Sequence, residues 1–238
     1  MNILKIVLPL RIRQLVKITI AAAQGDLPRL AELTGTDKWG VHWYAKHYAK
    51  HFTPLRWKRL RILEIGVGGG DNPKRGGASL RTWKYFFPRS QIYSIDIYDK
   101  HLLQEPRITI FQGDQSDSAF LQDAIQHMGT PDVIIDDGSH VNEHVLISFE
   151  TLFPLLHENG IYCVEDLQTS YWTEFGGSED DPRTSMNYFK KLADGLNWQE
   201  RQGHTPSYVE QHITAMHWYH NLLIIEKGKN DEKSNILQ

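Results

Sequence analysis

The sequence predicts an α/β protein with a central, mostly parallel β-sheet flanked by helices. Short apolar runs rich in β-branched residues alternate along the chain with segments of helical periodicity, which is typical of parallel strands buried on both faces. Several of these runs end abruptly in acidic residues. Because ligands bind at the edge where the carboxyl ends of parallel strands meet, these acids indicate a binding site at that edge.

The N-terminal part of the chain, residues 1–55, is predicted to be a helical segment that packs on a core domain of residues 56–238. Residues 3–23 are apolar but contain the basic residues Arg11, Arg13 and Lys17. Because these charges lie inside the apolar stretch, we expect neither a membrane span nor a signal peptide. We expect a basic amphipathic helix that packs on the domain or on a partner subunit of a homo-oligomer. A weak membrane-surface helix is the alternative.

The segment 34–52 is polar and aromatic. Tyr44, Tyr48 and Phe52 recur at every fourth position, so they lie on one stripe of a predicted helix. One interpretation is that this stripe packs against the sheet. The other is that the preceding Thr36-Asp37-Lys38 loop closes over a ligand, and the two interpretations are compatible.

A strand followed by a glycine-rich loop begins the core domain at residue 61. Gly66 and Gly68 let the backbone turn sharply and approach a ligand closely, as in the first turn of a Rossmann-like sheet. A nicotinamide-binding loop would have a third glycine where this chain has Asp71, and an acid is unfavourable beside a pyrophosphate. Together with Glu64 at the strand end, this favours a cationic or hydroxyl-bearing ligand. Ser79 is expected to cap the next helix.

The next two strands end in groups that suit a nucleoside. Asp96 lies near the end of the strand 91–98, where an acid can accept hydrogen bonds from ribose hydroxyls. Asp114 and Gln115 follow the strand that begins at residue 108, and an acid or amide there can accept from an adenine amino group.

Two later strands deliver acids and one imidazole to the same edge. The strand 132–136 runs into Asp137 and His140, and the next strand ends in Glu165-Asp166. These four side chains would form a compact acidic site. Alternation along the strand points Asp136 away from Asp137 and out of this site. The alternative is a structural turn followed by an ordinary acidic loop.

The remaining elements complete the sheet. Residues 168–182 form a long aromatic, acidic segment after the last acids, and this position favours a lid. A helix is expected over 185–196. The strands 213–217 and 221–227 are expected to pair as an antiparallel hairpin at the sheet edge.

The composition excludes several classes of protein. A net charge of −3 gives no electrostatic reason to expect nucleic acid as a partner. The single cysteine, Cys163, excludes a disulfide framework and is compatible with a reducing cytoplasm. The 12 histidines show no spacing typical of a zinc site.

The chain resembles a known enzyme family. The run from Leu63 to Gly70 looks like the first motif of class I S-adenosylmethionine-dependent methyltransferases. The chain is more specifically similar to the metal-dependent sugar O-methyltransferases of antibiotic biosynthesis, the mycinamicin and tylosin tailoring group, whose domain is also called cephalosporin hydroxylase-like. The likeness covers roughly residues 34–227 and rests on Thr36-Asp37-Lys38, Gly76-Gly77-Ala78-Ser79-Leu80 with Trp83, Gly113-Asp114-Gln115, Asp136-Asp137-Gly138-Ser139-His140, and Glu165-Asp166-Leu167 with Thr169-Ser170-Tyr171-Trp172.

This resemblance implies a Rossmann-like class I methyltransferase fold with a seven-stranded sheet. It also implies Mg²⁺ and S-adenosylmethionine as cofactors, a glycosylated small-molecule acceptor and a methyl transfer to a sugar hydroxyl. The implied metal ligands are Asp137, Glu165 and Asp166, with Asp137 also catalytic and His140 the base. The implied cofactor-binding residues are Glu64, Gly66, Gly68, Asp96, Asp114 and Gln115.

Other functions stay open at this point. A carboxylate could act as the base while His140 only orients the acceptor. A metal-dependent oxygenase on the same scaffold would need two histidines and one carboxylate, which only His140 and His144 could help supply. A ligand-binding module without catalysis is the third possibility.

Overall fold

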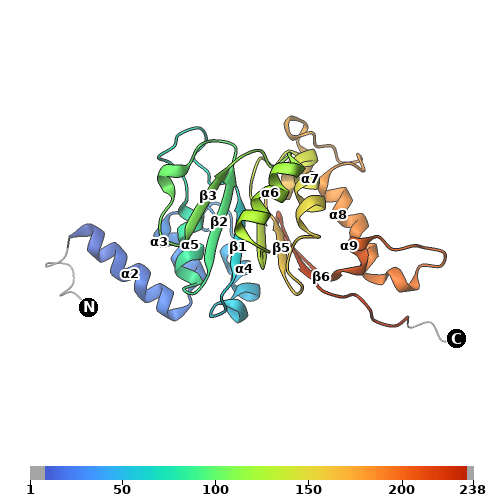
Figure 1. Cartoon of the computed structure of the whole chain (residues 1–238), viewed down its shortest axis with the longest axis horizontal. Helices are drawn as coiled ribbons and strands as arrows, with labels where there is room; N and C mark the ends of the chain where they lie inside the picture. The colour runs from blue at the N-terminus through green and yellow to red at the C-terminus, as the bar shows by residue number, and fades with distance from the viewer. Residues whose placement is uncertain (1–8, 235–238) are drawn as a thin grey trace.

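The computed structural model describes residues 9–234 and contains a seven-stranded sheet in the order β3-β2-β1-β4-β5-β7-β6 (Figure 1). Strands β1 to β5 pair in parallel, whereas β7 is antiparallel to β5 and to β6. The strands are β1 (Arg61–Ile65), β2 (Gln91–Asp96), β3 (Ile108–Gln112), β4 (Val133–Asp136), β5 (Ile161–Val164), β6 (Ile213–Tyr219) and β7 (Leu222–Lys227). The predicted parallel sheet with a C-terminal antiparallel hairpin is therefore confirmed.

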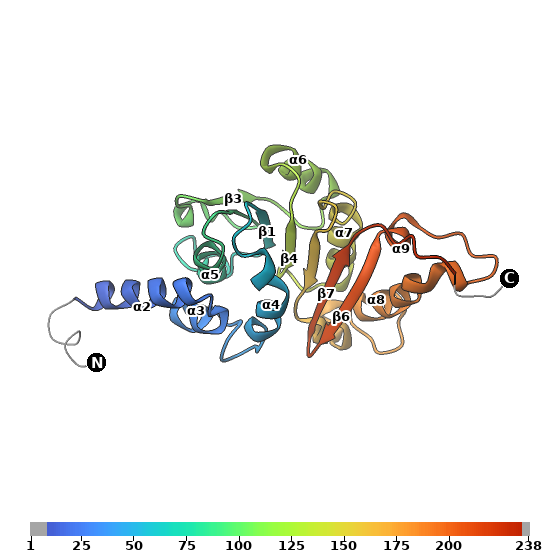
Figure 2. The ribbon, with the colours of Figure 1, turned by 90° about the horizontal axis from the view of Figure 1, so that it is seen from below.

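Helices cover both faces of this sheet (Figures 1 and 2). The α-helices are α2 (Leu10–Gln24), α3 (Leu27–Thr34), α4 (Ala45–Phe52), α5 (Ala78–Phe86), α6 (Ser118–Met128), α7 (Asn142–Leu152), α8 (Ser185–Ala193) and α9 (Tyr208–Gln211). Short 3-10 helices lie at η1 (Thr53–Leu55), η2 (His101–Leu103), η3 (Leu167–Tyr171), η4 (Thr173–Phe175) and η5 (Asp194–Glu200).

The core consists of one buried cluster on each face. Ile62 of β1 points into the cluster that also contains side chains of α2 to α5. The next residue, Leu63, points into the opposite cluster, which contains side chains of α6, α7 and α8. Because both faces are covered, the central strands carry apolar residues at consecutive positions, and this is why they were recognisable in the sequence.

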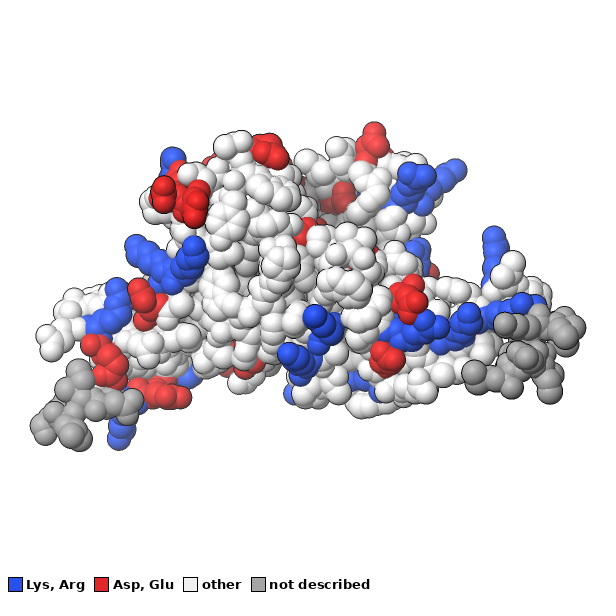
Figure 3. Space-filling model, turned by 180° about the vertical axis from the view of Figure 1, so that it is seen from behind, with Lys and Arg blue, Asp and Glu red and all other residues white. Residues whose placement is uncertain are grey.

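The N-terminal helices pack beside α5, but α2 projects away from the rest of the molecule (Figures 1 and 2). Along its length it exposes four large apolar side chains, namely Leu10, Ile12, Leu15 and Ile20. Positions 3–8 of the predicted helix lie outside the described residues. Among the residues that the structure describes, no helix is both long and apolar enough to cross a membrane. Acidic and basic side chains are interspersed around the periphery of the face shown in Figure 3.

Two predictions about helix ends were wrong. Helix α5 begins at Ala78 after Gly77, and the Ser79 side chain donates to Glu64 instead of capping the helix. The helix expected over 185–196 ends at Ala193 and continues as η5.

The segment after β5 is more ordered than the sequence suggested. It contains η3 and η4, and Asn142 on α7 fastens both. The Asn142 amide donates to the carbonyl oxygens of Thr169 and Phe175, and its oxygen accepts from Ser170. The base of the predicted lid is therefore docked on α7.

Candidate active site

A cavity of about 650 Å³ opens at the carboxyl ends of the parallel strands. Its wall is formed by the residues that directly follow β1 to β5, together with the loop before α4, as the topology predicts. The lining residues are Gly35, Thr36, Asp37, Ile65, Gly66, Val67, Gly68, Gly69, Gly70, Gly76, Ala78, Ser79, Ile95, Asp96, Ile97, Tyr98, Gly113, Asp114, Gln115, Asp137, Gly138, Ser139, His140, His144 and Asp166.

The glycine loop after β1 forms one side of the cavity. Gly66 has a φ of +98°, and a Cβ on it would collide with the carbonyl oxygen of Asp137. The backbone therefore needs glycine here both for its conformation and for its close approach to the loop after β4. Lys100, which is 1% exposed, holds the far side of the same loop by donating to the carbonyl oxygens of Gly70, Asn72 and Arg75.

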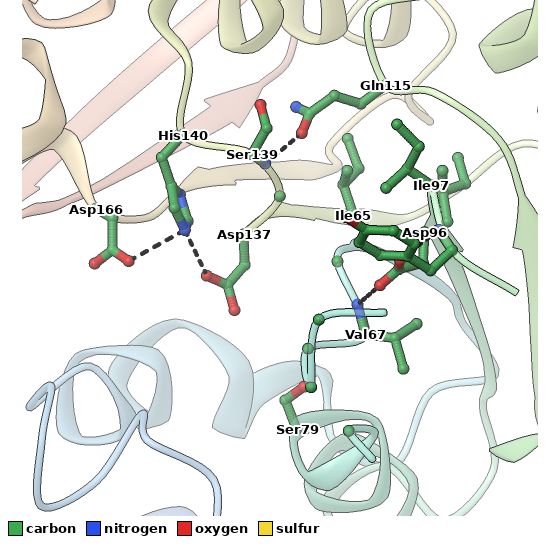
Figure 4. Close-up of a pocket in the computed structure, with 18 of the residues that line it drawn as sticks. Ile65, Val67, Ser79, Asp96, Ile97, Gln115, Asp137, Ser139, His140 and Asp166 are labelled. Atoms are coloured by element: carbon green, nitrogen blue, oxygen red, sulfur yellow. Dashed lines mark hydrogen bonds and ion pairs between the residues drawn. The ribbon is translucent and has the colours of Figure 1, made fainter. Parts of the chain in front are cut away.

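Two predicted cofactor acids, Asp96 and Asp114, line the cavity, and Figure 4 shows Asp96 beside Val67. Asp96 accepts from the Val67 amide at 2.9 Å and from the Tyr98 amide at 2.9 Å, so it fastens the glycine loop to the end of β2. Asp114 accepts from the amide and the hydroxyl of Ser116, and these hydrogen bonds lower the pKa of the Asp114 carboxyl.

Gln115 also lines the cavity, but its side chain already makes three hydrogen bonds within the protein. Its amide nitrogen donates to Asp136 at 3.2 Å and to Ser148 at 3.0 Å, and its oxygen accepts from the Ser139 amide at 2.6 Å. Gln115 therefore joins the loop after β3 to the loop after β4. Asp136 is buried outside the cavity, as predicted, and burial raises the pKa of its carboxyl to about 7.

At the other end of the cavity, His140 lies between two aspartates (Figure 4). Its Nε2 is 3.4 Å from Asp166 Oδ2 and 4.0 Å from Asp137 Oδ1. One ligand atom from each of the three side chains lies within 4.8 Å of the others, so the group is compact enough to hold a metal ion. His140 and Asp166 both have positive φ, 59° and 54°. This backbone strain is typical of residues that the surrounding structure holds in place for function.

Behind the cavity lies a cluster that the sequence did not reveal. We call Lys38, Glu64, Asp137 and Glu165 the buried lysine cluster. The ammonium of Lys38 is 2.6 Å from Asp137 Oδ2, 2.8 Å from both oxygens of Glu165 and 3.2 Å from Glu64 Oε1. Burial opposes the charge on Lys38, but the three carboxylates outweigh it and raise the pKa of the ammonium well above its usual value.

The pKa values of Glu64 and Glu165 in this cluster are raised. Burial raises the pKa of Glu64 to about 7, although Lys38 pulls that pKa down. Burial and the charge of Asp137 likewise raise the pKa of Glu165 well above its usual value, against the opposing effect of Lys38.

The aromatic stripe at α4, formed by Tyr44, Tyr48 and Phe52, donates two hydrogen bonds to the acids that follow β5. Tyr48 donates to Glu165 Oε1 at 2.6 Å, and Tyr44 donates to Asp166 Oδ1 at 2.6 Å. Burial opposes ionisation of Asp166, but the Tyr44 hydrogen bond and the charge of His140 outweigh it and lower the pKa of this carboxyl. The interpretation that the stripe packs in the core is therefore confirmed, and its two hydroxyls also reach the site. Closure of the Thr36-Asp37-Lys38 loop over a ligand stays a prediction.

Two predicted site residues do not line the cavity. Glu64 is fully buried, and its carboxylate accepts from Ser79 and Trp83 and faces Lys38, so the structure does not place it against a cofactor. Glu165 is 3% exposed and lies behind Asp137 and Asp166. Lys38 and Tyr48 donate hydrogen bonds to its carboxylate there.

Comparisons with known proteins give the site its chemical context. No family model matches the chain. The chain is 45% identical over 230 residues to demethylmacrocin O-methyltransferase from Streptomyces fradiae, a match that covers 92% of this chain and 58% of that enzyme. It is 45% identical over 225 residues to 8-demethyl-8-alpha-L-rhamnosyl tetracenomycin-C 2′-O-methyltransferase from Streptomyces olivaceus, covering 91% of this chain and 60% of the relative.

A solved structure agrees with these relatives. The MycE methyltransferase of mycinamycin biosynthesis, in complex with Mg, SAH and mycinamycin VI, superimposes with a TM-score of 0.82 at 44% identity. The match covers 90% of this chain and 57% of the MycE chain.

The chain is a homologue of the macrolide sugar O-methyltransferases.

This homology confirms the resemblance inferred from the motifs and the Rossmann-like O-methyltransferase fold. The chain spans between half and two thirds of the length of these relatives, since the matches cover 58%, 60% and 57% of them.

Proposed function

We propose that this homologue is a Mg²⁺-dependent O-methyltransferase that moves a methyl group from S-adenosylmethionine to a sugar hydroxyl of a glycosylated natural product. The observation that carries the proposal is the placement of Asp137, His140 and Asp166 at one end of a cavity whose other end is a glycine loop with Asp96. Such a cavity has room for a nucleoside cofactor and an acceptor side by side. The names of the relatives support the acceptor class.

The cofactor end of the cavity offers both polar and apolar contacts. Asp96 and Asp114 follow β2 and β3, where their remaining lone pairs can accept from ribose hydroxyls and an adenine amino group. Ile97 and Tyr98 are 59% and 47% exposed and line the same cavity, so they can cover the faces of a flat ring. The negative charge of the two acids also suits a sulfonium cation.

The metal end offers the oxygen donors that Mg²⁺ prefers. Asp137 and Asp166 face the cavity, and we propose that Glu165 completes the set through lone pairs not used by Lys38 and Tyr48. Bound S-adenosylmethionine would supply an activated methyl group, and bound Mg²⁺ would lower the pKa of an acceptor hydroxyl. The chain's own contribution is to orient the acceptor oxygen toward the methyl carbon.

His140 is the proposed base. Asp166 and Asp137 flank its Nε2 at 3.4 and 4.0 Å, which holds the imidazole at the acceptor end of the cavity. His140 would take the proton of the acceptor hydroxyl as the acceptor oxygen accepts the methyl group that bound S-adenosylmethionine would supply. Asp137 is the alternative base, with His140 orienting the acceptor.

The donor set argues against an oxygenase. An iron site of that kind needs two histidines and one carboxylate. The cavity group consists of one histidine and two aspartates among the described residues, and the Nδ1 of His144 is 3.0 Å from the Ser139 hydroxyl.

We also propose that residues 1–55 act as a helical segment that supplies Lys38, Tyr44 and Tyr48 to the site of a domain of residues 56–238, and that residues 168–182 form a lid.

We further propose a cytoplasmic homo-oligomer. The buried free thiol of Cys163 and the exposed apolar side chains of α2 support these two proposals, and light scattering of the purified protein tests the second.

Calorimetry with S-adenosylmethionine, with and without Mg²⁺, tests the main proposal when it is followed by mass analysis of demethylmacrocin as acceptor. Asp137→Ala should abolish Mg²⁺-dependent turnover while leaving cofactor affinity within about twofold. Asp96→Ala should weaken cofactor binding by about tenfold to a hundredfold, since it removes charge-assisted hydrogen bonds.

Asp99→Ala is the matched control, because Asp99 is exposed three residues after Asp96. This variant should behave as the wild type. If the protein bound no S-adenosylmethionine, the proposed reaction would be refuted. Equal loss of cofactor affinity in the Asp137 and Asp96 variants would refute the division of the cavity into a metal end and a cofactor end.

A further inference from the structure

A second group of metal-ligating side chains lies outside the cavity. His51 on α4, His217 on β6 and Glu226 on β7 place one ligand atom each within 4.8 Å of one another. None of the three lines the active-site cavity. Figure 2 shows α4 beside the β6–β7 hairpin, which is where these elements meet.

The spacing of the ligand atoms matches a small ion. His217 Nε2 is 2.8 Å from Glu226 Oε1, and His51 Nδ1 is 3.7 Å from the same oxygen. Tetrahedral zinc with bonds of about 2.0–2.2 Å needs neighbouring ligand atoms about 3.3–3.5 Å apart, so shifts of a few tenths of an ångström suffice. Such shifts lie within the range of ordinary side-chain motion.

The rest of the His51 ring is already held by a partner. Its Nε2 lies 2.9 Å from the Tyr219 hydroxyl, so Nδ1 is the nitrogen turned toward Glu226. A metal-binding histidine usually has its other nitrogen in such a hydrogen bond, which sets the tautomer and the direction of the ring. The Tyr219 ring also stacks on His47 at 4.0 Å between centroids, which limits its movement.

We propose that His51, His217 and Glu226 form a zinc site that is separate from the active site. Two imidazoles and one carboxylate are an established ligand set for Zn²⁺, with the fourth position left to water. The side chains of His217 and Glu226 are 35% and 42% exposed, so an ion can reach the site from solvent.

The site joins parts of the chain that are far apart in sequence. It links the last turn of α4 to both strands of the hairpin, and α4 carries Tyr48, which donates to Glu165. A bound ion would therefore fasten the helix that supports the acids of the active site. The proposal does not depend on which reaction the enzyme catalyses.

Zinc binding by the tag-free, chelator-treated protein tests the proposal. The readouts are the zinc retained after dialysis against buffered Zn²⁺ and the rise in melting temperature. At a hundredfold excess of Zn²⁺ over its dissociation constant, the wild type should melt about 5–10 °C higher. His217→Gln and Glu226→Gln should each retain one equivalent less and lose this rise. Both positions are partly exposed, so the apo variants should fold.

Two further variants separate this site from other sources of zinc binding. His220→Gln changes an exposed histidine in the turn of the same hairpin and should keep the full response. Asp137→Ala removes a possible zinc ligand of the active site and should also keep the response from the second site. The proposal is overturned if Asp137→Ala loses the response while His217→Gln keeps it, or if all four variants bind zinc as the wild type does.

Discussion

Replacing Lys38 by methionine should destabilise the protein by about 3–5 kcal/mol at pH 8, the usual effect of removing one partner of a buried ion pair. Lys38 is 1% exposed and its ammonium lies within 3.2 Å of the carboxylates of Asp137, Glu165 and Glu64. Methionine has a similar length and no charge. The three acids would therefore be left without the cation that offsets their burial.

The loss of stability should depend on pH. Without Lys38, the pKa values of Glu64 and Glu165 rise further above those of the unfolded chain, since the opposing charge is gone. A carboxyl with a raised pKa in the folded state contributes stability that is fully present below its unfolded pKa and is lost as the pH rises through the folded pKa. Glu64 already has a pKa of about 7, so the deficit of the variant should grow between pH 5 and pH 8.

Urea unfolding at pH 5 and pH 8, followed by tryptophan fluorescence, measures this difference. Lys46→Met is the matched control, because Lys46 is exposed on α4, and it should change the unfolding free energy by less than about 0.5 kcal/mol. The double variant Lys38→Met/Glu165→Gln should recover at least about 1 kcal/mol, because the two side chains are in contact. Two results would contradict the described ion pairs of Lys38. One is an unfolding free energy of Lys38→Met within about 1 kcal/mol of wild type at pH 8, which is near the typical effect of a point mutation. The other is an equal loss of stability at both pH values.

Two other predictions follow from the packing around the cavity. Asp136→Asn should raise the unfolding free energy at pH 8 by on the order of 1–4 kcal/mol and leave it nearly unchanged at pH 4. The reason is that the carboxyl of Asp136 has a pKa of about 7, so its ionisation opposes folding above neutral pH. Equal effects at both pH values in urea unfolding would contradict this. Gly66→Ala should destabilise the fold by roughly 2–5 kcal/mol, because its Cβ meets the Asp137 carbonyl in a left-handed backbone. Gly68→Ala, with a φ of +76° and open space around its Cβ, should lose only about 1–2 kcal/mol, and similar melting temperatures for the two variants would contradict the steric argument.

The sheet could be predicted because its cause is local in sequence. Consecutive apolar residues such as Ile134 and Ile135 point into opposite cores, so a buried strand is visible as an apolar run. Residues that follow the strands, among them Asp96, Asp137 and His140, must then meet at one edge. This is why most of the predicted site residues do line the cavity.

Contacts between distant segments could not be predicted in this way. Lys38 is 99 residues from Asp137 and 127 from Glu165, and no periodicity in the sequence relates these positions. The motif Thr36-Asp37-Lys38 was recognised as a possible lid, yet Lys38 is one of the most deeply buried side chains. Similarly, His51 and His217 have no zinc-like spacing along the chain and come together only because β6 packs beside α4.

The sequence alone determined the α/β architecture, the edge of the sheet that carries the site and the residue types placed there, because these follow from strand burial and from the direction of parallel strands. The tertiary structure decided which of those acids face the cavity and which are neutralised behind it. Glu64 and Glu165 contact Lys38 and do not reach the cavity. Asp137, which also contacts Lys38, lines the cavity together with Asp166 and His140. The physical reason is that a buried carboxylate needs a partner, and only the folded chain brings Lys38 close enough to provide one.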